Sequence, residues 1–105
     1  MGGEWIDACA LDDIDEEDVI AFEHDGHAYA LYRTADDRYF ATDDLCTHEQ
    51  AYLADGLVMD TIIECPKHNG RFDFITGQAK GAPVCVNLKT YETLERDGRL
   101  FIKAH

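Results

Sequence analysis

Residues 19–32 read VIAFEHDGHAYALY, which is two apolar runs on either side of an Asp-Gly pair. Asp25-Gly26 predicts a two-residue hairpin turn, because both residue types tolerate the positive φ that such a turn requires. β-Branched and aromatic residues in both runs favour strands. The stretch therefore predicts two antiparallel strands, over 19–22 and 28–32, joined by a tight turn.

Short strands and turns continue on both sides of this hairpin. A second hairpin is expected at Asp97-Gly98. The further strands are expected over 5–8, 39–42, 61–64, 71–74, 90–95 and 99–102. No long stretch has the period near 3.6 of an amphipathic helix, and 12–18 is expected to form a loop or one helical turn. The chain is therefore predicted to be all-β, an antiparallel sandwich or barrel.

Length and charge narrow the classes of function. The 105 residues suit a single domain spanning 1–105, and the formal net charge of −13 argues against nucleic acid and anionic membranes as partners. No apolar run reaches the ~20 residues that a membrane helix needs. The first residues, MGGEWI, lack the features of a secretory signal, so we expect a cytoplasmic protein.

Two short motifs combine cysteine and histidine. Cys46 and His48 stand in C-T-H, and Cys65 and His68 stand in C-P-K-H. Each pair follows an expected strand, and Pro66 prevents the second strand from continuing in a ladder, so both pairs are predicted to lie on loops. Two thiolates and two imidazoles are the ligand set of a [2Fe–2S] cluster with cysteine on one iron and histidine on the other.

This ligand set has a consequence for redox chemistry. Replacing two thiolates by neutral imidazoles makes the cluster less negative, so its potential rises to roughly −150 to +300 mV, compared with about −400 mV for four-cysteine ferredoxins. A small protein with such a cluster is expected to move single electrons. An alternative remains open, because two cysteines and two histidines also satisfy tetrahedral zinc. The chain would then be a zinc-stabilised binding module, although zinc fingers usually pair like residues with like.

The residues around both motifs resemble the Rieske-type [2Fe–2S] ferredoxins, which are electron-transfer components of bacterial Rieske oxygenase systems. The resemblance rests on CTHEQAYLADG at 46–56 and IECPKHNGRFD at 63–73, and continues in TG at 76–77 and LKTYE at 88–92. It implies a Rieske-type β-sandwich or barrel with a small inserted cluster-binding subdomain at about 43–84.

The resemblance also implies the ligands and the function. Cys46 and Cys65 would hold one iron of a single [2Fe–2S] cluster, and His48 and His68 would hold the other. The protein would carry electrons from a flavin-containing, NAD(P)H-dependent ferredoxin reductase to a terminal Rieske oxygenase. It would not be an enzyme itself, because it has no G-x-G-x-x-G motif for a nucleotide and no room for a second iron domain. The alternative is a small subunit bound permanently in a nitrite-reductase-like oxidoreductase.

The chain departs from its high-potential relatives in three places. It lacks the extra cysteine in each loop that forms a disulfide between the loops. Gly70 and Phe72 stand where those relatives place a serine and a tyrosine hydroxyl near the sulfurs. Fewer hydrogen bonds to sulfur predict a potential at the low end of the Rieske range. The loop expected to cover the cluster, 81–87, keeps Pro83 but has Asn87 in place of a second proline.

The remaining candidates are expected to be structural. Cys9 and Cys85 are predicted to be buried, reduced thiols, with a disulfide between them as an alternative. The two histidines of the first hairpin, His24 and His27, are expected to be solvated. The large aromatic residues are expected in or at the edge of the core: Trp5, Tyr29, Tyr32, Tyr39, Phe40 and Phe101.

Overall fold

The structure, a computed structural model, describes residues 4–47, 51–67, 70–80 and 86–104. The strands in chain order are β1 (Glu4–Ala10), β2 (Asp18–His24), β3 (His27–Arg33), β4 (Tyr39–Asp43), β5 (Leu57–Met59), β6 (Ile62–Glu64), β7 (Arg71–Asp73), β8 (Thr90–Tyr91), β9 (Thr93–Arg96) and β10 (Arg99–Ala104). Two single 3-10 turns are present, η1 (Leu11–Asp13) and η2 (Leu53–Asp55). The described residues contain no α-helix, which confirms the all-β prediction.

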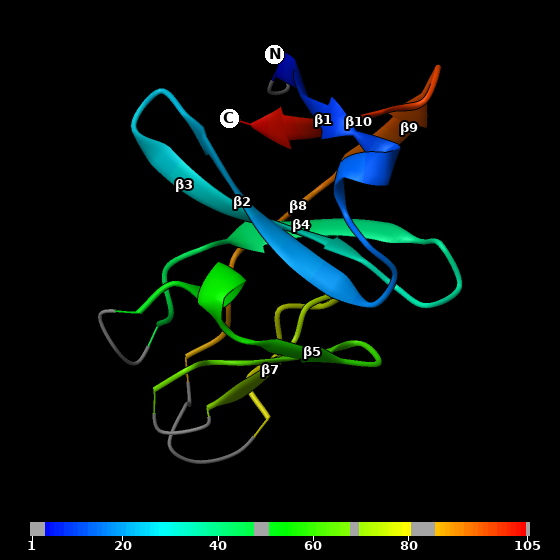
Figure 1. Cartoon of the computed structure of the whole chain (residues 1–105). Helices are drawn as coiled ribbons and strands as arrows, with labels where there is room; N and C mark the ends of the chain where they lie inside the picture. The colour runs from blue at the N-terminus through cyan, green and yellow to red at the C-terminus, as the bar shows by residue number, and fades with distance from the viewer. Residues whose placement is uncertain (1–3, 48–50, 68–69, 81–85, 105) are drawn as a thin grey trace.

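The strands form three antiparallel sheets. Their orders are β1-β10-β9, β2-β3-β4-β8 and β5-β6-β7. Figure 1 shows the four-stranded sheet in the middle of the molecule, with β1, β9 and β10 on one side and β5 and β7 on the other. The two described ends of the chain lie together at the side of β1 and β10, away from β5 to β7.

Both predicted Asp-Gly turns are present. Asp25 and Gly26 have φ of 52° and 77°, and Asp97 and Gly98 have φ of 52° and 76°. Two consecutive positive φ values match the twist of the flanking strands, so each turn fixes the register of its hairpin. His24 accordingly pairs with His27 across the first turn.

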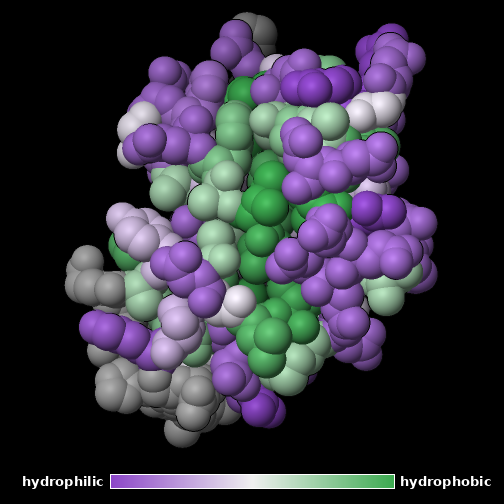
Figure 2. Space-filling view, in the orientation of Figure 1, coloured by the Kyte–Doolittle hydropathy of each residue, from purple (hydrophilic) through white to green (hydrophobic). Residues whose placement is uncertain are grey.

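The central sheet has a hydrophobic cluster on each face. Along β3, Tyr29 and Leu31 belong to the cluster shared with β1 and β10. Ala30 and Tyr32 belong to the other cluster, which includes residues of β5, β6 and β7. This alternation follows from the period of two in a strand. On the face shown in Figure 2, a band of hydrophobic residues runs between two hydrophilic areas.

Three details differ from the sequence prediction. Strand β5 was not predicted, and the expected strand over 90–95 is split at Glu92 into β8 and β9. Trp5 was expected in the core or at its edge, but the residue is 43% exposed on the edge strand β1 and belongs to neither hydrophobic cluster. There it lies beside the Lys103 ammonium, with Nζ 5.8 Å from the ring centroid.

No helix in the described part of the chain is long and apolar enough to cross a membrane.

Candidate metal centre

The first Cys-His motif begins at the base of a closed loop. Leu45 pairs with Tyr52 in an isolated antiparallel bridge. Inside this bridge the Cys46 N–H donates to the Ala51 carbonyl at 2.9 Å. The chain between Cys46 and Ala51 therefore has its two ends fixed side by side.

The second motif has the same construction. Glu64 in β6 pairs with Arg71 in β7, and Arg71 Nε lies 3.0 Å from Glu64 Oε1. Inside this pair the Cys65 N–H donates to the Gly70 carbonyl at 2.7 Å. Each cysteine is thus the first residue of a loop closed by its own backbone N–H.

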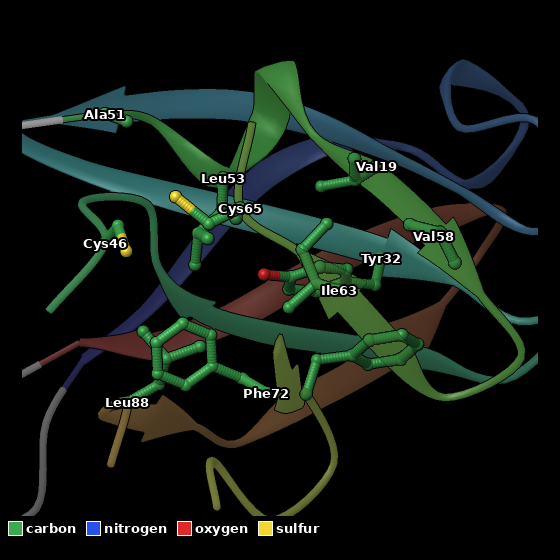
Figure 3. Packing of buried hydrophobic residues seen from close by; sticks show 12 residues of the cluster. Val19, Tyr32, Cys46, Ala51, Leu53, Val58, Ile63, Cys65, Phe72 and Leu88 are labelled. Atoms are coloured by element: carbon green, nitrogen blue, oxygen red, sulfur yellow. The ribbon is translucent and has the colours of Figure 1, made fainter. Parts of the chain in front are cut away.

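Both cysteines point into the protein interior. Cys46 is 4% exposed and Cys65 is 1% exposed, and both belong to the hydrophobic cluster between the four-stranded sheet and β5 to β7. Figure 3 shows the two sulfur atoms at the same end of this cluster. Burial of two soft ligands at one end of a single cluster is the arrangement that a shared metal centre needs.

A third segment, of which the structure describes residues 77–80 and 86–88, is attached to the first loop and to β7 beside the second loop. The Thr47 hydroxyl donates to the Val86 carbonyl at 2.7 Å, and the Lys80 N–H donates to the Arg71 carbonyl at 2.8 Å. Asn87 Oδ1 accepts a hydrogen bond from the Ala79 N–H at 2.9 Å. Asn87, at the end of the expected covering loop, is therefore bonded to the chain just before that loop. Proline has no side-chain acceptor and could not make this hydrogen bond. Residues 81–85, including Pro83 and Cys85, lie outside the described residues.

The two histidine ligands also lie outside the described residues. His48 and His68 fall in the undescribed ranges 48–50 and 68–69. Within the described ranges, no three His, Cys, Asp or Glu side chains come together as a metal-binding group. The assignment of His48 and His68 as ligands therefore stays a prediction.

The described residues fit a [2Fe–2S] cluster. The donors are two thiols from different loops, brought together in a region closed to water. Gly70 and Phe72 stand at the two positions where high-potential relatives are expected to have a hydroxyl. Gly70 has no side chain, and Phe72 is fully buried in the same hydrophobic cluster as the cysteines. Neither residue can donate a side-chain hydrogen bond to a sulfur atom.

One group that supports the first loop was missed. His27 Nε2 lies 2.6 Å from Asp43 Oδ1, and the Tyr91 hydroxyl donates to the same oxygen at 2.6 Å. Burial and the hydrogen bond to Asp43 raise the pKa of the Tyr91 hydroxyl, so it remains a donor. We expected His27 to be solvated, but its ring is held by Asp43. These contacts fix the end of β4, from which the chain continues into the loop of Cys46.

Asp44 provides a second support that the sequence did not indicate. The residue is 2% exposed, its carboxylate accepts a hydrogen bond from the Ala54 N–H at 2.8 Å, and its carbonyl accepts one from the Leu53 N–H at 2.7 Å. Burial raises the pKa of this carboxyl group, partly offset by the Ala54 hydrogen bond. Asp44 thus attaches η2 to the strand side of the first loop.

Cys9 lies far from this centre in the fold, on β1. It is 7% exposed and has no disulfide partner among the described residues. Burial, followed by the nearby Asp13 carboxylate, raises the pKa of its thiol. The prediction of a buried, reduced thiol is confirmed for Cys9, whereas the state of Cys85 stays a prediction.

Comparison with known proteins agrees with this geometry. The family model of the Rieske [2Fe-2S] domain matches residues 4–92. The chain therefore belongs to the Rieske [2Fe–2S] domain family, and one [2Fe–2S] cluster is its cofactor.

Similarity to individual proteins narrows the family to one class, the ferredoxins. The chain is 46% identical over 102 residues to the ferredoxin component of the naphthalene 1,2-dioxygenase system of Pseudomonas aeruginosa, covering 97% of both chains. It is also similar to the ferredoxin of Sphingomonas yanoikuyae B1, with a TM-score of 0.90, 37% identity and coverage of 97% and 100%. The ferredoxin in a complex of reduced oxygenase and oxidized ferredoxin of carbazole 1,9a-dioxygenase has a TM-score of 0.89, 32% identity and coverage of 94% and 92%.

These similarities extend over nearly the whole chain and exceed what a shared fold alone would give. The protein is a Rieske-type ferredoxin, the electron-carrying component of a multicomponent dioxygenase system.

Proposed function

We propose that Cys46 and Cys65 hold one iron of the [2Fe–2S] cluster and that His48 and His68 hold the other. The observation that carries this proposal is the common construction of the two loops, in which each cysteine N–H closes a loop that contains the paired histidine. We also propose that residues 43–84 form the cluster-binding subdomain. The separate sheet of β5, β6 and β7 supports this division.

The bound cluster supplies the ability to accept and release one electron. The protein residues determine how easily this happens. The hydrophobic cluster around Cys46 and Cys65 excludes water from the thiolates, and the hydrogen bond from Thr47 to the Val86 carbonyl keeps the third segment against the first loop. A rigid, preformed surrounding limits the rearrangement that accompanies each change of charge.

The partners proposed for this chain are a flavin-containing, NAD(P)H-dependent reductase and a terminal Rieske oxygenase. The similarity to ferredoxins of naphthalene and carbazole dioxygenases supports an oxygenase that acts on an aromatic compound. The net charge of −13 supports recognition through basic surfaces on both partners. We further propose that the protein acts in the cytoplasm, which the reduced thiol of Cys9 supports.

Substitution of one ligand tests the assignment. His68→Ala is expected to abolish the visible spectrum of the cluster or convert it, because only three protein ligands remain. His24→Ala is the matched control, since this histidine lies outside both Cys-His motifs and stacks on Phe22 with ring centroids 6.3 Å apart. A wild-type spectrum in His68→Ala would show that this residue is not a ligand.

Two alternative readings give different results. A zinc-stabilised module would be colourless and would not react with dithionite, whereas the iron–sulfur protein is coloured and bleaches when reduced. A permanently bound subunit would stay with its oxidoreductase at high salt. A carrier that exchanges partners would dissociate from them as salt screens the charges.

A further inference from the structure

A groove lies beside the first cysteine loop, outside the metal centre. Its volume is about 420 Å³, and it lies between the β2–β3 hairpin and η2, which Figure 1 shows next to each other. Three alanines line it, Ala21 on β2, Ala28 on β3 and Ala54 on η2. Their small side chains leave a space that larger residues at these positions would fill.

The groove is acidic. Its other lining residues include the exposed Glu23 and Asp55 and the buried Asp44, and none of the lining residues is basic. Within the described ranges neither Glu23 nor Asp55 forms an ion pair, although Arg71 and Arg99 each pair with a carboxylate elsewhere. The negative charge of the groove is thus not compensated by described residues of the protein.

The groove also contains an exposed aromatic side chain. Tyr52 is 51% exposed, and Phe22 contributes to the same lining. Carboxylates beside an aromatic ring suit a guanidinium group, which can bind carboxylates through a planar set of N–H donors and stack on a ring. A lysine ammonium is a compact, strongly hydrated charge and would use the ring less well.

The position of the groove connects it to electron transfer. Tyr52 pairs with Leu45 at the base of the loop that Cys46 begins. A protein attached to the groove therefore lies directly beside the metal centre. The groove thus provides a place to hold a partner without occupying the loops themselves.

We propose that this groove receives an arginine side chain of the protein that exchanges electrons with the cluster. The proposal rests on the function proposed above, because it needs a protein partner. Its chemical basis is the match between an uncompensated acidic groove with an exposed tyrosine and a planar cation.

Charge removal tests the proposal. The double variant Glu23→Gln and Asp55→Asn keeps size and removes two charges at the groove. Glu95→Gln with Asp97→Asn is the matched control, because it removes the same charge from exposed positions on the β9–β10 hairpin. The electron-transfer rates are measured with the reductase and oxygenase components of the naphthalene 1,2-dioxygenase system.

We expect the groove variant to lower the second-order rate constant about tenfold with at least one component, and more than the control does. Its visible spectrum and midpoint potential should stay unchanged. Ala21→Phe, which fills the groove without changing charge, should lower the same rate constant. If the groove variant and Ala21→Phe both match the control, the proposal is wrong. If the wild-type protein itself takes up no electron from dithionite, the proposed function fails instead.

A measurement that needs no protein partner tests the groove independently of the proposed function. Titration of the oxidised protein with N-acetyl-arginine amide, followed by NMR, should shift the backbone amide signals of Ala21 and Glu23. The shifts should be smaller with N-acetyl-lysine amide and absent in the groove variant. Equal shifts with both probes, or unchanged shifts in the variant, would overturn the proposal.

Discussion

At the scale of single residues, Cys46 and Cys65 occupy equivalent places in two loops of different sequence. Each donates its N–H across its own loop, to Ala51 and to Gly70 respectively, and each side chain is buried in the same cluster. The sequence motifs singled out these two residues as candidate ligands, because the spacing of cysteine and histidine is a local feature, and the structure buries both in one hydrophobic cluster. The contacts of His27 and Asp43 were not foreseeable, since they join residues that are distant in the chain and share no motif.

Phe72 provides a prediction about the potential. The substitution Phe72→Tyr adds a hydroxyl to the hydrophobic cluster in which both cysteines are buried. A hydrogen bond from this hydroxyl to a sulfur atom would stabilise the reduced state of the [2Fe–2S] cluster. One neutral hydrogen bond of about 1 kcal/mol corresponds to a rise on the order of 40 mV for one electron. Protein-film voltammetry measures the change. A potential equal to or below that of the wild type would show that the hydroxyl does not reach a sulfur atom.

Cys9 provides a prediction about reactivity. Because burial and Asp13 raise the pKa of its thiol, the folded protein should contain less Cys9 thiolate at pH 8 than the unfolded protein does. Iodoacetamide should therefore modify Cys9 at least about tenfold more slowly in the folded than in the urea-unfolded protein. Mass spectrometry of the peptide that contains Cys9 measures both rates. Equal rates would contradict the described burial.

At the scale of elements, local signals predicted more than long-range ones. The Asp-Gly turns at 25–26 and 97–98 fixed two hairpins, because turn geometry depends on adjacent residues. Strand β5 was missed because three residues give too little pattern. The split between β8 and β9 follows from their different neighbours, since β8 pairs with β4 and β9 pairs with β10. No local signal reveals such a change of sheet.

Gly77 tests how the third segment is attached. It has φ of +82°, and an added Cβ would lie 2.2 Å from the Leu88 carbonyl oxygen. Gly77→Ala must therefore shift the backbone hydrogen bond from the Leu88 N–H to the Gly77 carbonyl. Gly26 is the matched control, because its φ is +77° and an added Cβ would meet open space.

We expect Gly26→Ala to lower the free energy of unfolding by roughly 1–2 kcal/mol through its φ alone. Gly77→Ala should lower it by at least about 1 kcal/mol more, because a steric conflict is added. Urea unfolding of the holoprotein, followed by circular dichroism, measures both. Equal losses would show that the approach of Leu88 to Gly77 is not as close as described.

At the scale of the whole molecule, the four-stranded sheet separates two hydrophobic clusters with different roles. One packs against β1 and β10, and the other contains the two cysteines. The whole chain carries a formal net charge of −13, and recognition of this charge by basic surfaces on partner proteins stays a prediction. The groove beside η2 could not be predicted, because it depends on alanines from three elements.

The charge predicts opposite salt effects with two kinds of electron donor. The rate of reduction by a partner reductase with a basic docking surface should fall severalfold between about 0.05 and 0.5 M NaCl, because salt screens the attraction. The rate of reduction by dithionite, which is an anion, should rise over the same range as repulsion is screened. Stopped-flow absorbance measures both rates. A fall with both donors would indicate that salt alters the protein itself.

Pulsed electron paramagnetic resonance of the dithionite-reduced holoprotein tests whether two cysteines and two histidines hold one [2Fe–2S] cluster that takes up a single electron. We expect a paramagnetic signal from one electron per chain, coupled to imidazole nitrogens of two histidines. One of the two couplings should be lost in any His68→Ala protein that retains a cluster. A reduced protein that contains iron and sulfide but shows no nitrogen coupling would contradict this assignment.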